Sequence, residues 1–130
     1  MEPIPAPAPQ LISPENFELR FGRLLQQGRY EDMWELIAED ARRAWGGRGE
    51  FLRRMREQRT MARVVDTQIK SVSMLPRWTD AAGRRTYRNV ASLNVRYLVR
   101  EGDRELSLDR RVHLIPAAGG WRTLFYPVED

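Results

Sequence analysis

Few residues of this 130-residue chain have the type and spacing needed for chemistry. Asp66 alternates with Gln68 and Lys70 on a predicted strand, and an inward-facing carboxylate there could act as a general base. Asp109 and His113 lie four residues apart on a later predicted strand, so they share one face. That face is polar, which favours a solvated strand surface over an acid–base pair. Asp66 is therefore the best single candidate for a base, provided that it faces inward.

Arg110 interrupts the apolar face of its own predicted strand. The neighbours on that face are Leu106, Leu108, Val112 and Leu114. A cation there must snorkel, pair with a carboxylate or line a polar cavity. One interpretation is an ion pair with an acidic residue of the helical layer; the other is a binding group for an anion or carboxylate. The aromatic residues that could wall such a pocket, or equally fill a core, are Tyr30, Trp34, Trp45, Tyr97 and Trp121.

Several classes of site are excluded by composition. The chain has no cysteine, so disulfides and thiolate nucleophiles are ruled out, and His113 is its only histidine. Zinc sites built from nitrogen and sulfur are thereby nearly excluded. Gly46-Gly47 lacks the Lys-Ser/Thr sequel of a phosphate-binding loop. We expect no metal and no cofactor.

The charge of the chain raises the question of nucleic-acid binding. The net charge is +4 and the pI is about 10.1. Lys70 is the only lysine among 22 basic residues, and 18 acidic residues are interleaved with the arginines. This distribution favours a solvated surface, so binding of nucleic acid through arginine is the least favoured of three functional hypotheses. No apolar run approaches the length of a membrane span, and no signal peptide is evident, so we expect a cytoplasmic protein, or a secreted one if the chain has been trimmed.

Three helices are predicted in the first half of a single domain over residues 13–130, after a proline-rich, extended segment at 1–12. Ser13 can cap the first helix, with Pro14 at its first position, and Gly28 ends it. The second lies in the stretch QQGRYEDMWELIAEDARRAW, residues 26–45. Its apolar residues recur at helical spacing, and its acidic residues fall mainly on the remaining, solvated surface. The third follows Gly49, with Phe51, Leu52 and Met55 inward.

Four strands are predicted after the helices, near residues 62–76, 85–100, 105–116 and 121–127. Gly102-Asp103 forms a two-residue turn, and counting outward from it sets the register of the central hairpin. Val95 then lies opposite Arg110 on the apolar face, and Arg96 lies opposite Asp109 on the polar face. A slip of one residue would destroy this sorting. Continuing the register leaves a half-apolar outer face, on which we predict a homodimer contact through Val90, Leu98, Ile115, Leu124 and Tyr126.

These elements predict an α+β fold, in which three N-terminal helices pack on a curved, four-stranded antiparallel meander sheet. The layout resembles the NTF2-like (cystatin-like) superfamily, and within it the NTF2-like domains at the N-terminus of some penicillin-binding transpeptidases. The resemblance is carried by LLQQGRYEDMWELIAEDAR, GEFLRRM and the closing GGWRTLFYP, and covers residues 15–127. It implies a cone of helices and sheet around a pocket.

The resemblance implies a fold more specifically than a function, because the superfamily contains isomerases, dehydratases, cyclases and epoxide hydrolases beside pockets with no known reaction. The first hypothesis is a non-catalytic module that binds a small molecule or a protein, with Arg110 holding a negative group. The alternative is an isomerase, dehydratase or cyclase, which requires Asp66 to face inward. The enzyme hypothesis predicts a titrating inward carboxylate, whereas the binding module requires none.

Overall fold

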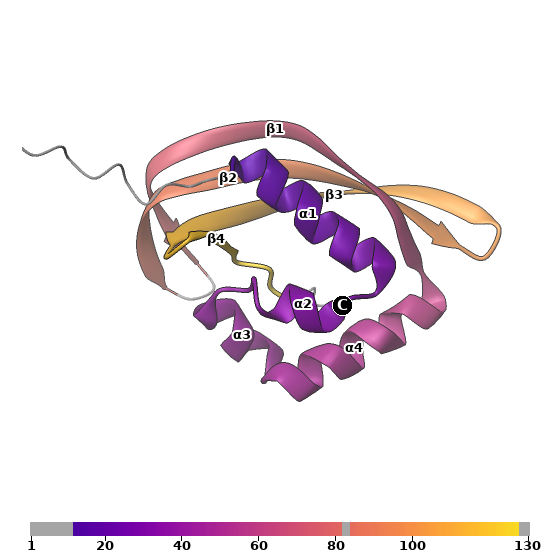
Figure 1. The fold of residues 1–130 in the computed structure, drawn as a ribbon. Helices are drawn as coiled ribbons and strands as arrows, with labels where there is room; N and C mark the ends of the chain where they lie inside the picture. The colour runs from indigo at the N-terminus through magenta and orange to yellow at the C-terminus, as the bar shows by residue number, and fades with distance from the viewer. Residues whose placement is uncertain (1–11, 82–83, 128–130) are drawn as a thin grey trace, which may run out of the picture.

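The computed structural model describes residues 12–81 and 84–127. They form a curved antiparallel sheet with helices on its concave side (Figure 1). The predicted α+β class with a curved meander sheet is confirmed. The segment predicted at 1–12 lies outside the described residues except for Ile12. The helices are α1 (Pro14–Gln27), α2 (Tyr30–Trp34), α3 (Glu39–Trp45) and α4 (Arg48–Met61), and the strands are β1 (Arg63–Asp80), β2 (Arg85–Glu101), β3 (Arg104–Ala117) and β4 (Gly120–Thr123).

Helix α1 begins and ends where the sequence signals predict. The Ser13 hydroxyl accepts a hydrogen bond from the Asn16 backbone N–H at 3.1 Å, and Pro14 occupies the first turn. Gly28 ends the helix at φ 72°, a left-handed conformation that glycine adopts without steric cost. The helix crosses the concave face of the sheet with Phe17 and Phe21 buried beneath it.

The single helix predicted within residues 26–45 is wrong, because the chain forms α2 and α3 with an extended linker between them. In the linker, the Ala38 N–H donates to the Thr123 carbonyl at 2.8 Å, and the Thr123 N–H donates to the Leu36 carbonyl at 2.9 Å. The linker thus pairs with the outer edge of β4 and satisfies backbone groups there. This tertiary pairing outweighs a helical pattern that contains no glycine or proline to mark the break.

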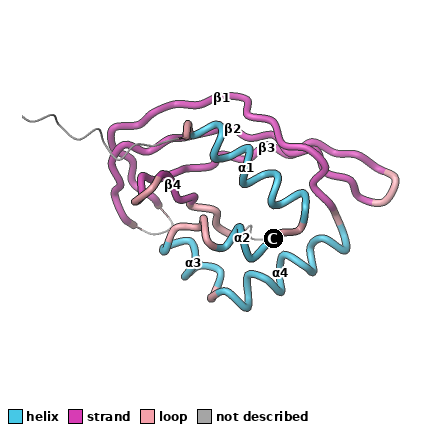
Figure 2. The backbone as a smooth tube through the Cα atoms, viewed as in Figure 1, coloured by secondary structure: helices cyan, strands magenta, loops and turns pink. Residues whose placement is uncertain are grey.

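The predicted register of the central hairpin is confirmed. Val95 pairs with Arg110 and Arg96 with Asp109, and Gly102 takes a positive φ of 66° in the turn. The Arg96 Nε lies 2.8 Å from the Asp109 Oδ1. Figure 2 shows this long hairpin reaching past the helices. The strand predicted at 121–127 is shorter in the structure, where β4 ends at Thr123.

The hairpin formed by β1 and β2 folds over the outer face of the sheet near its far end. Pro76 in β1 lacks an N–H, and Asn89 in β2 is left-handed at φ 56°, so the strands bend there. Beyond the bend, the Trp78 ring stacks on His113 of β3 with centroids 3.8 Å apart. Figure 1 shows this end of the hairpin turning toward α3.

Two tyrosine–aspartate hydrogen bonds join this folded hairpin end to the rest of the protein. The Tyr87 hydroxyl donates to Asp40 of α3, and the Tyr126 hydroxyl donates to Asp80. Burial and the acceptor carboxylates raise the pKa of both tyrosines, so both hydroxyls keep their protons at neutral pH. Asp40 had been predicted on a solvated helix surface, but its side chain is only 7% exposed.

Part of the predicted dimer face is not available on the surface of the chain. Val90 and Leu124 are buried within the chain, at 0% and 5% exposure, so neither can contact a second subunit. Ile115 and Tyr126 are half-buried against the core. Leu98 remains half-buried on the outer face, and homodimerisation itself stays a prediction.

Removing one hydroxyl should loosen the folded-over hairpin. Tyr126→Phe leaves the buried Asp80 carboxylate short of one donor, and hydrogen bonds to charged groups contribute about 1.5–3 kcal/mol. We expect urea unfolding to show a loss of this size. Thr86→Val, which removes an exposed hydroxyl contact on the same hairpin, is the control and should change stability by less than about 0.5 kcal/mol. Equal losses in both variants would contradict this role for Tyr126.

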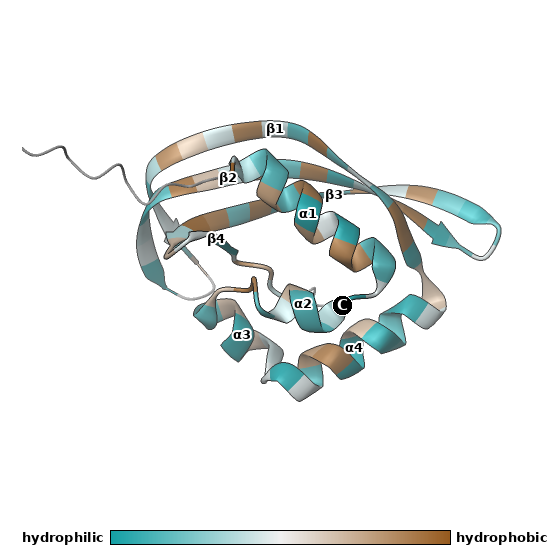
Figure 3. Ribbon diagram, viewed as in Figure 1, coloured by the Kyte–Doolittle hydropathy of each residue, from teal (hydrophilic) through white to brown (hydrophobic). Residues whose placement is uncertain are grey.

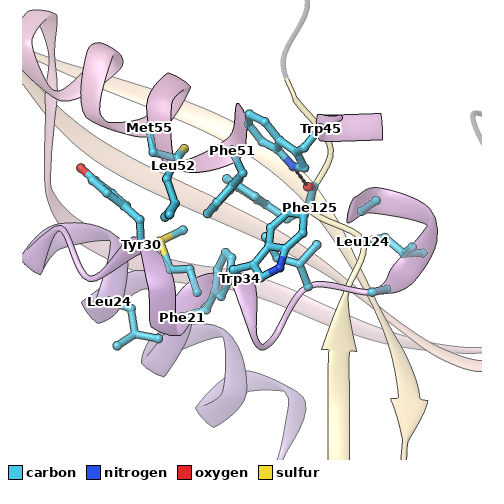
Figure 4. Packing of buried hydrophobic residues seen from close by; sticks show 14 residues of the cluster. Phe21, Leu24, Tyr30, Trp34, Trp45, Phe51, Leu52, Met55, Leu124 and Phe125 are labelled. Atoms are coloured by element: carbon cyan, nitrogen blue, oxygen red, sulfur yellow. Dashed lines mark hydrogen bonds between the residues drawn. The ribbon is translucent and has the colours of Figure 1, made fainter. Parts of the chain in front are cut away.

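Aromatic side chains from all four helices and the C-terminal segment form one part of the core (Figure 4). Phe51 lies between Trp34 and Trp45, with ring centroids at 5.3 and 4.9 Å. The Trp45 indole N–H donates to the Phe125 carbonyl at 2.7 Å, as the dashed line in Figure 4 marks. A second cluster lines the concave face of the sheet, where hydrophobic and hydrophilic residues alternate along the strands (Figure 3). The helices are thereby held at fixed positions over the sheet.

None of the helices in the described ranges is both long enough and apolar enough to cross a membrane.

Candidate ligand pocket

A pocket of about 530 Å³ opens between the helices and the part of the sheet next to the β2–β3 hairpin. Its walls come from the end of α1, the middle of α4, the first three strands and the C-terminal segment. The apolar lining residues are Leu25, Met55, Val64, Val99, Leu108 and Phe125. The polar ones are Gln58, Tyr97, Asp109 and Arg110. An apolar pocket with a few polar groups is typical of small-molecule sites.

Arg110 reaches the pocket because the hairpin register places it on the concave face, opposite Val95. Its guanidinium lies 4.4 Å from the centroid of the Phe125 ring, and one Nη donates to the Tyr126 carbonyl at 2.5 Å. Its other N–H groups have no partner among the described residues, yet they are not sealed from solvent. Burial lowers the pKa of Arg110, but an arginine keeps its charge at neutral pH. The pocket wall therefore carries a positive charge with donors to spare.

Glu18 of α1 is the acidic residue that faces this cation from the helical layer. Its side chain is completely buried, and neither carboxylate oxygen has a hydrogen-bond partner among the described residues. Burial raises the pKa of Glu18 to about 8, opposed by the charge of Arg110 and by the Tyr97 hydroxyl. Glu18 and Arg110 form no ion pair within 4.0 Å. Glu18 is thus the acidic residue of the helical layer that the ion-pair interpretation of Arg110 required, but its carboxyl group makes no direct contact with the guanidinium.

Tyr97 of β2 links the pocket to this buried carboxyl group. Its ring lines the pocket, while its hydroxyl is buried with no partner of good geometry. Burial, and after it the charge of Glu18, raises the pKa of Tyr97 well above its ordinary value. The neighbouring Thr67 hydroxyl is also buried and unpartnered, and lies so close to Gly22 that a Cβ there would come within 2.5 Å of it. Gly22 is therefore what lets α1 approach β1 this closely.

The predicted acid–base residues do not meet at the pocket. Asp66 is exposed and pairs in register with Leu98 of the outer face, so it does not face inward. Asp109 borders the pocket, but its carboxylate is paired with Arg96. His113 stacks under Trp78, and burial lowers its pKa. None of the three supplies a free base to the pocket.

Of the five predicted wall aromatics, Tyr97 is the one that lines this pocket. Tyr30 borders a smaller adjoining hollow of about 60 Å³. Trp34 and Trp45 belong to the helical core, and Trp121 to the cluster on the concave face of the sheet. These three are core residues and do not line this pocket, as their helical and strand spacing allows, so a role for them in ligand binding stays a prediction.

Glu18 was missed, although the sequence held a signal for it. It directly follows Phe17 and lies one turn before Phe21, so it falls within the apolar stripe of α1. A carboxylate in such a stripe is buried if the helix is covered over that turn. Arg110, a cation among the apolar residues of the concave face of β3, was the matching signal.

The described residues contain no group of three or more histidine, aspartate or glutamate side chains that could hold a metal ion. No protein-family model matches the sequence, and the curated proteins contain no significant match.

Proposed function

We propose that this protein is a non-catalytic, NTF2-like module that binds a small, largely apolar molecule carrying a negative group. The observation that carries the proposal is the apolar pocket with one positive wall group, Arg110, whose donors are not all used by the residues that the structure describes. The apolar part of the ligand would lie among side chains such as Val64 and Val99. Its negative group would meet the guanidinium of Arg110.

The enzyme alternative has lost its proposed base. It required Asp66 to face inward, and Asp66 lies exposed on the other face. Glu18 is an inward carboxyl group with a raised pKa, as that hypothesis requires, but it is not among the residues that line the pocket. Catalysis would need a substrate atom within hydrogen-bond reach of the base. A binding role needs only Arg110 and the apolar walls.

Nucleic-acid binding gains no support from the arginines whose partners are seen. Arg53 pairs with Glu50 and Glu57 on α4, at 2.5 and 2.9 Å. Arg96 pairs with Asp109 across the central hairpin. Such pairs neutralise the surface locally, so we place this function below small-molecule binding.

Filling the pocket should abolish binding of an apolar probe. N-phenyl-1-naphthylamine, a neutral dye that brightens in apolar sites, serves as the ligand. Val99→Trp puts an indole into the pocket and should weaken dye binding by at least about tenfold, or 1.4 kcal/mol. Fluorescence titration measures the dissociation constant.

The matched control is Leu98→Trp, one residue away on the opposite face of β2. It should leave the dissociation constant within about twofold of wild type, which is below 0.5 kcal/mol. Circular dichroism would verify that both variants are folded. If the dye does not bind wild type, or if both variants bind it as wild type does, the pocket is not the ligand site.

A further inference from the structure

We propose that the pocket binds its ligand as a monoanion only while Glu18 carries a proton, so that the ligand supplies the negative charge facing Arg110. This inference rests on the proposed function and adds the charge of the ligand and a proton linkage. The ligand class is a small apolar acid bound in its ionised form.

The charges at this site must compensate one another, and this limits how many the site can hold. Arg110 on β3 and Glu18 on α1 act on each other electrostatically; the Glu18 carboxyl group is closed to water, and Arg110 is half-buried in the pocket wall. With Glu18 ionised, the two charges compensate, and an added anion would leave a net negative charge in a poorly solvated site. With Glu18 protonated, the anion and Arg110 compensate instead. Burial of an uncompensated charge is costly, so the second arrangement is favoured.

No other described group that faces Glu18 can change its charge in place of Glu18 near neutral pH. In the part of the chain that the structure describes, the charged or titratable groups that act on it from the sheet are Arg110 and Tyr97. Arginine stays charged, and the pKa of Tyr97 is raised further from neutrality. Thr67 of β1 does not titrate, and the charged neighbours on α1, Arg20 and Arg23, are exposed. Glu18 is thus the group whose charge can change near neutral pH.

Among the described residues, the Tyr97 hydroxyl is the one donor that favours the ionised form of Glu18, and its effect is smaller than that of burial. Carboxylates with low pKa values accept several hydrogen bonds, whereas neither buried oxygen here has a partner of good geometry among the described residues. The pKa of about 8 places the exchange of charge just above neutral pH. Binding of an anion should therefore weaken as the pH rises through this value. Glu18 acts through Arg110 and is a positioning residue rather than a contact of the ligand.

A matched pair of dyes tests this. 8-Anilinonaphthalene-1-sulfonate has the same apolar frame as N-phenyl-1-naphthylamine plus a sulfonate that stays ionised throughout. If only the protonated form of Glu18 permits anion binding, the sulfonate dye should bind about thirtyfold more weakly at about pH 9.5 than at about pH 6.5. The neutral dye should change by less than about twofold over the same range.

Two variants assign the effect. Glu18→Gln cannot ionise, so the sulfonate dye should bind it equally at both pH values. Arg110→Met should lose the preference for the sulfonate dye over the neutral dye. Loss of the pH dependence in Glu18→Gln supports the inference; the same pH dependence in wild type and Glu18→Gln overturns it, as does pH-independent binding to wild type. If neither dye binds at any pH, the proposed function itself fails.

Discussion

Glu18→Gln is expected to make the protein more stable than wild type at about pH 8.5, by on the order of 4 kcal/mol. The side chain is completely buried, and its two oxygens have no hydrogen-bond partner of good geometry among the described residues. Ionising it costs free energy in the folded state that it does not cost in the unfolded state. Glutamine has nearly the same shape and does not ionise, so the variant avoids this cost.

The direction of the pH dependence follows from the raised pKa. The ordinary pKa of Glu18 is 4.5, and burial raises it to about 8 in the folded protein. Between these values the folded state binds one proton more than the unfolded state, so the free energy of unfolding falls as the pH rises. The contribution is fully present below about pH 4.5 and is lost as the pH rises through about 8.

Urea unfolding of both proteins at several pH values measures this difference. The wild-type and Glu18→Gln curves should nearly coincide at about pH 4.5 and separate steadily toward about pH 8.5. Subtracting them removes the titration of groups common to both, His113 among them. Glu15→Gln, an exposed carboxylate on the same helix, is the matched control and should follow wild type. Curves for Glu18→Gln that remain parallel to wild type would show that Glu18 does not hold a proton in the fold.

Phe51→Ala is expected to lower the free energy of unfolding by about 3–5 kcal/mol. Phe51 is fully buried, and its ring contacts Trp34 and Trp45, so it joins α4 to α2 and α3. Removing the ring loses burial and leaves a cavity between two indoles that are held by other contacts. For a domain of this size, such a loss removes a large fraction of the total stability.

Thermal and urea unfolding would measure the loss in Phe51→Ala. Met61→Ala, at the exposed end of the same helix, is the control, because Met61 is 72% exposed. It should change stability by less than about 0.5 kcal/mol. A similar small change in Phe51→Ala would mean that α4 does not depend on this contact to pack on the other helices.

The sequence was sufficient to predict the central hairpin and the start of α1. In the hairpin, apolar and polar residues sort onto two faces in one register only, and Gly102 provides the turn. In α1, Ser13 and Gly28 are local signals at the two ends. Such features are decided by neighbours in the chain, which is why pattern and spacing are enough.

Features that depend on distant partners could not be predicted in this way. Leu36–Ala38 leave the helix because β4 offers backbone partners more than 80 residues later, as the Ala38–Thr123 hydrogen bond shows. The folding-over of β1 and β2 buries Val90, although strand alternation predicts it on an outer face. The sequence predicted that an acidic residue of the helical layer would face Arg110, but not which one. Glu18 could be identified only from the position of α1 on the sheet.

The measurement that most directly tests small-molecule binding in this pocket is an isotope-filtered NOE experiment with 8-anilinonaphthalene-1-sulfonate bound at about pH 6.5, where Glu18 is protonated. The aromatic protons of the dye should show NOEs to the methyl groups of Val99 and Val64, which line the pocket. They should show none to Leu98, which lies on the other face of the same strand. NOEs to Leu98 without any to Val99 would place the ligand outside the pocket and contradict the proposed function.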